Sequence, residues 1–170
     1  QPFLHHHRID GTPVLPGVMG IEGFAEVAHV LAPGWHVTAV EDIELLAPFK
    51  FYRDEPRTLE LRARVRDAGD GSLIADCELV GRRTLAGAGE QETLHFTGRA
   101  RLSREAPEAP SAAAPHEAEG VGHDDVYKVY FHGPAYQVLE RAWRENGDVV
   151  GAFAPDLPAD HDPDERDTEF

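Results

Sequence analysis

The chain has little cysteine and no long apolar run. Cys77 is its one cysteine, so an internal disulfide and a metal site built from several cysteines are both excluded. No apolar run approaches the ~20 residues that cross a bilayer, and the start shows no secretory signal. We therefore expect a cytoplasmic protein without a membrane segment. Because the chain opens on Gln1 instead of methionine, we also expect a piece of a longer protein.

Positive charge is scarce as well. The 170 residues carry 16 lysines and arginines against 31 aspartates and glutamates, a formal net charge of -15. Such a surface repels a phosphate backbone, so we expect no nucleic-acid partner. The hydrophobic content of 41% is sufficient for the core of one ordinary domain.

One segment shows the periodicity of a helix. Apolar residues recur at three- and four-residue steps between Gly17 and Leu31, and Pro33-Gly34 marks the end of the pattern. Pro16 precedes it, at a position where a missing N–H is tolerated. The pattern predicts a helix over residues 17–31 that is buried on most sides.

After this helix the apolar period becomes two. Alternating segments over residues 35–51, 58–65, 73–82 and 93–102 are separated by turn-forming residues and predict antiparallel strands. One apolar helix followed by several long strands indicates an α+β fold, in which an antiparallel sheet wraps around a central helix.

The second half of the chain is organised differently. Residues 104–120 are rich in Ala, Pro and Glu and predict a linker. Beyond it, residues 137–143 alternate, and Asn146-Gly147 predicts a hairpin turn before another short strand. The last fifteen residues are acidic and predict a solvated tail. We therefore divide the chain into residues 1–103, the linker 104–120, and residues 121–170, a second unit that is incomplete.

The best candidate for chemistry is a histidine near the start. His7, Gly11 and Pro16 have the spacing H-x-x-x-G-x-x-x-x-P within the sequence HRIDGTPVLPGVMGIE. This segment resembles the active-site signature of dehydratase domains in polyketide and fatty-acid synthases. Its sequence is most similar to that of iterative type I synthases, including the enediyne and polyunsaturated-fatty-acid types. The resemblance covers residues 1–103 well and residues 126–154 moderately.

The resemblance implies a double hot-dog fold with an active site between two helix-in-sheet units. His7 would be the catalytic base that removes the α-proton of a β-hydroxyacyl thioester, a role that suits an imidazole near neutral pH. The N–H of Gly17, at the positive end of the helix dipole, would stabilise the thioester oxygen, and Gly11 and Pro16 complete the substrate-binding signature. No cofactor or metal is expected. The substrate would arrive on the phosphopantetheine of an acyl carrier protein, within a multidomain synthase that can also form a homodimer.

A second, weaker signature lies after the linker. Residues 129–136, VYFHGPAY, resemble the family's G-Y-x-Y-G-P-x-F, with Tyr130, Gly133 and Pro134 matched and with His132 and Tyr136 in place of Tyr and Phe. Tyr130 and His132 are therefore predicted to line the tunnel leading to His7. The alternative is a Gly-Pro turn that merely starts a strand.

Two observations leave other functions open. The family's general acid, an aspartate four residues before Gln or His, has no match in this sequence, so the acid cannot be named. Its absence favours a non-catalytic hot-dog domain that acts as an interaction or scaffold part of a synthase. Hot-dog thioesterases and enoyl hydratases bind the same phosphopantetheine arm and are a further alternative.

For His5 and His6 we expect no catalytic or metal-binding role, because neighbouring side chains in an extended segment diverge.

Overall fold

The computed structural model describes residues 2–85, 89–108 and 119–156. The chain divides into two compact units. The helix unit is Leu15–Pro110, and the histidine unit joins Gln1–Val14 to Ser111–Phe170. Residues 1–14 thus group with the second part of the chain, whereas the assignment of residues 1–103 and 121–170 to two hot-dog units stays a prediction. The linker core, residues 109–118, and the acidic tail, residues 157–170, lie outside the described residues.

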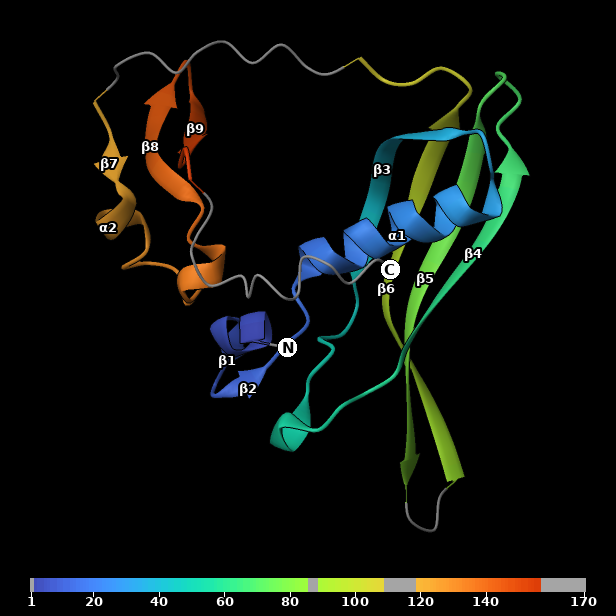
Figure 1. Cartoon of the computed structure of the whole chain (residues 1–170), viewed down its shortest axis with the longest axis horizontal. Helices are drawn as coiled ribbons and strands as arrows, with labels where there is room; N and C mark the ends of the chain where they lie inside the picture. The colour runs from blue at the N-terminus through green and yellow to red at the C-terminus, as the bar shows by residue number, and fades with distance from the viewer. Residues whose placement is uncertain (1, 86–88, 109–118, 157–170) are drawn as a thin grey trace. The chain divides into compact units, whose positions relative to one another are not determined.

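The helix unit contains one long helix and one antiparallel sheet (Figure 1). The helix α1 spans Gly17–Leu31, as the periodicity predicted. The sheet has the strand order β3-β6-β5-β4. Its strands are β3 (His36–Leu45), β4 (Leu59–Asp67), β5 (Leu73–Leu85) and β6 (Gly89–Ser103), and a short 3-10 helix, η2 (Tyr52–Asp54), follows β3. The predicted α+β class and antiparallel strands are confirmed.

The helix packs across one face of this sheet and contacts all four strands (Figure 1). Phe24 is completely buried and meets Leu79 and Phe96 in the core of the unit. Two glycines on the same helix face, Gly20 and Gly23, allow the close approach, since a Cβ on Gly20 would lie 2.4 Å from the ring of Phe96. The core therefore depends on a helix surface without side chains at these two positions.

The expectation that α1 is buried on most sides is wrong. Val18 and Leu31, which the periodicity assigned to the buried face, are 66% and 50% exposed, and Val30 is 72% exposed. Only the side of the helix that faces the sheet is covered within the described residues. A single sheet can bury only one side of a helix, which is why the apolar sequence of α1 overstates its burial.

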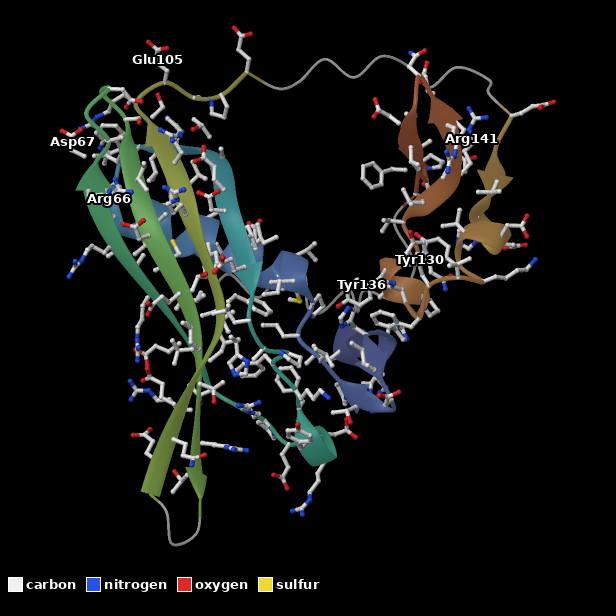
Figure 2. All side chains as sticks on the ribbon, turned by 180° about the vertical axis from the view of Figure 1, so that it is seen from behind. Arg66, Asp67, Glu105, Tyr130, Tyr136 and Arg141 are labelled. Carbon is white, nitrogen blue, oxygen red and sulfur yellow. The ribbon has the colours of Figure 1, made fainter. Side chains whose placement is uncertain are left out.

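The other face of the sheet is polar, which explains the alternating sequence of the strands. On this polar face, the Nε of Arg66, which is labelled in Figure 2, lies 2.9 Å from a carboxylate oxygen of Asp76. Arg62 pairs with Glu60 and Glu92 at 2.8 and 2.6 Å. These ion pairs are partly exposed, so each contributes little to stability, and the apolar face supplies the driving force for folding.

The histidine unit is built from short elements. Its elements are η1 (Pro2–His6), β1 (Arg8–Ile9), β2 (Thr12–Pro13), β7 (Val121–Gly122), α2 (His123–Val126), η3 (Pro134–Tyr136), β8 (Leu139–Glu145) and β9 (Asp148–Phe153). β1 and β2 form a two-stranded sheet, and β7, β8 and β9 form a three-stranded sheet in that order. The predicted hairpin turn at Asn146-Gly147 is confirmed, with φ angles of 51° and 95°. Among the residues that the structure describes in the two units, no helix is long and apolar enough to cross a membrane.

Candidate active site

His7 is held at the base of a tight hairpin. The backbone N–H of Val14 donates to the carbonyl of His7 at 3.0 Å, and Nδ1 of the His7 ring lies 2.8 Å from the carbonyl oxygen of Val14. Between them, β1 and β2 are joined by Asp10 and Gly11, whose φ angles are 49° and 75°. Glycine adopts this left-handed conformation without strain. Gly11 of the signature therefore closes the turn that returns the chain to His7.

The hydrogen bond to Val14 determines which ring nitrogen of His7 can act as a base. A carbonyl oxygen can only accept, so Nδ1 must carry the proton of the neutral imidazole. The Nε2 nitrogen then has a free lone pair. Among the described residues no hydrogen bond to Nε2 is found, and His7 as a residue is 9% exposed. The protein thus presents an imidazole in a fixed orientation, with Nε2 as the nitrogen that can take a proton.

Three aromatic rings of the second signature surround His7. The ring centroids of Phe131, His132 and Tyr136 lie 5.0, 5.3 and 5.5 Å from that of His7, with interplanar angles between 57° and 63°. Phe131 and His132 also stack on one another, with centroids 4.4 Å apart. The structure thus brings residues 131, 132 and 136 beside His7. That Tyr130 and His132 line a substrate tunnel stays a prediction.

Sequence reasoning missed the residue that joins these segments, His6. Its carbonyl accepts the N–H of Gly133 at 2.7 Å, and its ring Nδ1 accepts the N–H of Ala135 at 3.3 Å. Gly133 has to be glycine because an added Cβ would lie 2.8 Å from the Cβ of His6. The Gly-Pro pair was the available signal, but nothing in the sequence indicates its partner.

Burial changes the acid–base properties of two rings around His7. Burial lowers the pKa of His132, and the neighbouring His7 lowers it further. His132 is therefore uncharged at neutral pH and suited to hydrogen bonding. Burial also raises the pKa of Tyr136 to about 12, so its hydroxyl keeps its proton over the physiological range.

Tyr130 lies at the outer edge of this group. Its ring centroid is 5.9 Å from that of His132, and the side chain is 55% exposed. Figure 2 shows Tyr130 and Tyr136 in the segment that follows α2. Among the ring contacts of the described residues, His7 meets Tyr136, which stands where the second signature has phenylalanine, and does not meet Tyr130. The two tyrosines of the segment thus occupy different environments.

Pro16 and Gly17, the last residues of the first signature, belong to the helix unit. Pro16 caps the start of α1 with φ of -60°, and its carbonyl accepts the N–H of Met19 at 3.1 Å. Gly17 is the first helical residue, and a Cβ there would lie 3.3 Å from a methyl group of Leu45. The backbone N–H of a first helical residue has no partner inside its own helix. The assignment of this N–H to a thioester oxygen stays a prediction.

Carboxylates are not part of the group around His7 that the structure describes. No carboxylate in residues 2–85, 89–108 and 119–156 pairs with His7, and no cluster of three or more His, Cys, Asp or Glu in those ranges could hold a metal ion. The acidic tail, with Asp160, Asp162, Asp164 and Asp167, lies outside them. In the part of the chain that the structure describes, the surroundings of His7 therefore consist of aromatic rings and backbone hydrogen-bonding groups.

Comparisons with known proteins identify the family. Residues 1–76 match the family model of the polyketide synthase dehydratase domain. Polyketide synthase GfsE of Streptomyces halstedii is 30% identical over 158 residues, which cover 88% of this chain and 4% of that protein. A polyunsaturated fatty acid synthase polypeptide of Thraustochytrium sp. is 26% identical over 138 residues, which cover 81% of this chain and 5% of that protein.

A solved structure shows the same fold. The dehydratase domain from the CurF module of curacin polyketide synthase superposes with a TM-score of 0.63 at 19% identity, over 92% of this chain and 56% of that domain. The chain thus spans about half the length of that solved domain and a small part of the synthases. The hot-dog fold expected from the signature is confirmed by this likeness. The match of residues 1–76 to the family model and the similarity to polyketide synthases along 88% of the chain support a polyketide synthase dehydratase domain.

Proposed function

We propose that this chain supplies the base of a dehydratase that removes water from a β-hydroxyacyl thioester on an acyl carrier protein. The observation that carries the proposal is the hydrogen bond between Nδ1 of His7 and the carbonyl of Val14. It leaves Nε2 as the proton acceptor and fixes the ring in one orientation. A base that is already oriented avoids part of the entropic cost of the reaction.

The reaction needs two proton transfers, and His7 performs the first. Nε2 takes the proton from the α-carbon, the electrons form the carbon–carbon double bond, and the β-hydroxyl leaves as water once an acid protonates it. His132 is a poor candidate for that acid, because burial and His7 both lower its pKa. We assign His132 to hydrogen bonding with the substrate, which agrees with its predicted place in the tunnel leading to His7. The acid itself is left unassigned.

The surroundings of His7 support dehydration over a scaffold role. A non-catalytic domain has no need to fix the orientation of an imidazole, yet His7 is 9% exposed, is hydrogen-bonded to Val14 and contacts three rings. Aromatic side chains exclude water from an acyl chain and keep the base from being solvated. The same surroundings fit an acyl group delivered by a carrier protein within a multidomain synthase. The relative from Thraustochytrium supports the finer assignment to the polyunsaturated-fatty-acid type, and a homodimer is part of the same proposal.

The decisive experiment compares two histidine variants of the full-length protein. His7→Ala should reduce dehydration of a β-hydroxyacyl carrier protein by about 10²–10⁴-fold, the usual contribution of a general base. His5→Ala is the matched control, because His5 is exposed and its ring meets only the side chain of Arg8 among the described contacts. Circular dichroism establishes that both variants are folded.

Mass spectrometry of the carrier protein distinguishes the alternatives. Loss of water from the attached acyl group indicates a dehydratase, whereas loss of the whole acyl group indicates a thioesterase. Equal activity losses in His7→Ala and His5→Ala would mean that the histidines form a structural cluster. Full activity of His7→Ala would reject His7 as the base.

A further inference from the structure

Tyr136 carries the one feature of the site that the proposed function does not use. Its hydroxyl oxygen is completely buried, and among the described residues it has no hydrogen-bond partner. The ring meets His7 edge-on, with centroids 5.5 Å apart and an interplanar angle of 63°. Native proteins seldom leave a buried hydroxyl unpaired, so the exception calls for a physical explanation.

A second tyrosine of the same unit, Tyr127, has a hydroxyl that is fully hydrogen-bonded within the protein. The hydroxyl of Tyr127 donates to the carbonyl of Tyr136 at 3.4 Å and accepts the N–H of Leu139 at 2.9 Å. Both of its hydrogen-bonding functions are satisfied within the protein. Tyr136 is held in place by the backbone of η3, where its N–H donates to Gly133 at 3.0 Å, and its hydroxyl is not needed for that. The family signature places phenylalanine at this position, so the ring alone is enough for packing.

We propose that the hydroxyl of Tyr136 donates a hydrogen bond to the β-hydroxyl oxygen of the acyl substrate and makes the site selective for β-hydroxyacyl groups. The inference rests on the proposed function, because it takes the α-carbon to lie against Nε2 of His7. The β-oxygen is then two bonds from the α-carbon and falls among the rings that contact His7. Of these, Phe131 offers no polar atom, whereas His132 can also hydrogen-bond to the substrate. Tyr136 is distinguished from His132 by a buried hydroxyl that has no partner among the described residues.

The properties of the hydroxyl agree with this role. Burial raises the pKa of Tyr136 to about 12, so the group is a permanent donor and keeps its proton throughout the reaction. A donor aimed at the β-oxygen binds it more strongly as negative charge develops there during cleavage of the carbon–oxygen bond.

The test measures binding in the full-length protein, in a His7→Ala background that prevents turnover. The probes are β-hydroxybutyryl pantetheine and butyryl pantetheine, which differ only in the β-hydroxyl. Adding Tyr136→Phe should weaken binding of the hydroxylated probe about 3- to 10-fold and leave the butyryl probe unchanged within about twofold. Equal weakening of both probes, or of neither, overturns the proposal.

Two further measurements guard against a trivial structural effect. Tyr136→Phe should raise the urea midpoint of the ligand-free protein, because it removes an unpaired buried hydroxyl, whereas a lower midpoint would reveal an internal partner and overturn the proposal. Tyr127→Phe is the matched control: it should lower that midpoint and leave the ratio of the two probe affinities unchanged. A Tyr127→Phe variant with an altered ratio would also overturn it.

The outcome is separable from that of the proposed function. If His7→Ala retains dehydration while Tyr136→Phe still discriminates between the probes, the proposed base fails and the hydroxyl contact stands. If His7→Ala abolishes dehydration while Tyr136→Phe does not discriminate, the base stands and the contact fails.

Discussion

Gly20→Ala should destabilise the helix unit although alanine is the better helix former. A Cβ at this position would lie 2.4 and 2.6 Å from two ring carbons of Phe96. Ordinary carbon–carbon contacts begin at about 3.5 Å, so the ring or the helix would have to move by about 1 Å. Phe96 is only 3% exposed and packs in the core between α1 and the sheet, so it has no free space to move into.

The net effect is the difference between two opposing terms. Alanine in place of glycine stabilises a helix interior by about 1 kcal/mol. Overpacking of a core costs about 1–3 kcal/mol, and an overlap of this depth places Gly20→Ala near the upper end. We therefore expect a loss of about 2 kcal/mol in the free energy of unfolding. A Cβ at Gly23 would lie 2.9 Å from a methyl group of the half-buried Leu61, which has more room to move than Phe96. Gly23→Ala should therefore leave the free energy of unfolding nearly unchanged, because the gain in helix propensity and the overpacking cost are each about 1 kcal/mol.

Urea unfolding followed by circular dichroism measures both variants in the full-length protein. A double mutant adds a control, because Phe96→Leu removes the atoms that Gly20→Ala would meet. The two changes should be less than additive, with a coupling energy of about 1 kcal/mol or more. Equal or greater stability of Gly20→Ala than of the unmutated protein would refute the close packing of helix and sheet at this point.

Two further predictions concern buried titratable groups. Burial lowers the pKa of His95 below its ordinary value of 6.5, so the unfolded chain binds more protons than the folded protein as the pH falls. The contribution of His95 to stability is therefore complete above about pH 6.5 and is lost below it. The urea midpoint should decrease between about pH 7 and 5.5, with a smaller decrease in His95→Asn; an unchanged slope would contradict this. Cys77 is 2% exposed and burial raises its pKa to about 11, so iodoacetamide at about pH 8 should label it only after unfolding. Rapid labelling of the folded protein would contradict that burial.

Local sequence signals predicted the long helix and the longer strands correctly because they act over a few residues, whereas the short elements were not predicted. Pro16 and Pro33-Gly34 limit α1, and the observed helix has the predicted bounds. The hairpin at Asn146-Gly147 formed as predicted, because these residues accept positive φ angles. The strand ends agree less well: the segment predicted over residues 35–51 is a strand only to residue 45 and continues as irregular chain.

The burial of side chains and the contacts between distant segments could not be predicted, because both depend on residues far apart in the sequence. The apolar periodicity of α1 is the same whether one side or several are covered, and the exposure of Val18 and Val30 became clear only from the packing on one sheet. The contact of His6 with Gly133 spans more than a hundred residues and has no local signal.

The candidate site divides in the same way. The spacing of His7, Gly11 and Pro16 identified His7 as the candidate base, and the structure shows a tight turn that returns the chain to this residue. Only the tertiary structure showed that Nδ1 of His7 is hydrogen-bonded to the carbonyl of Val14 and which rings surround it. The sequence specifies which groups are available and how the local backbone turns, whereas proton positions and unpaired hydroxyls follow from contacts that form when distant segments pack together.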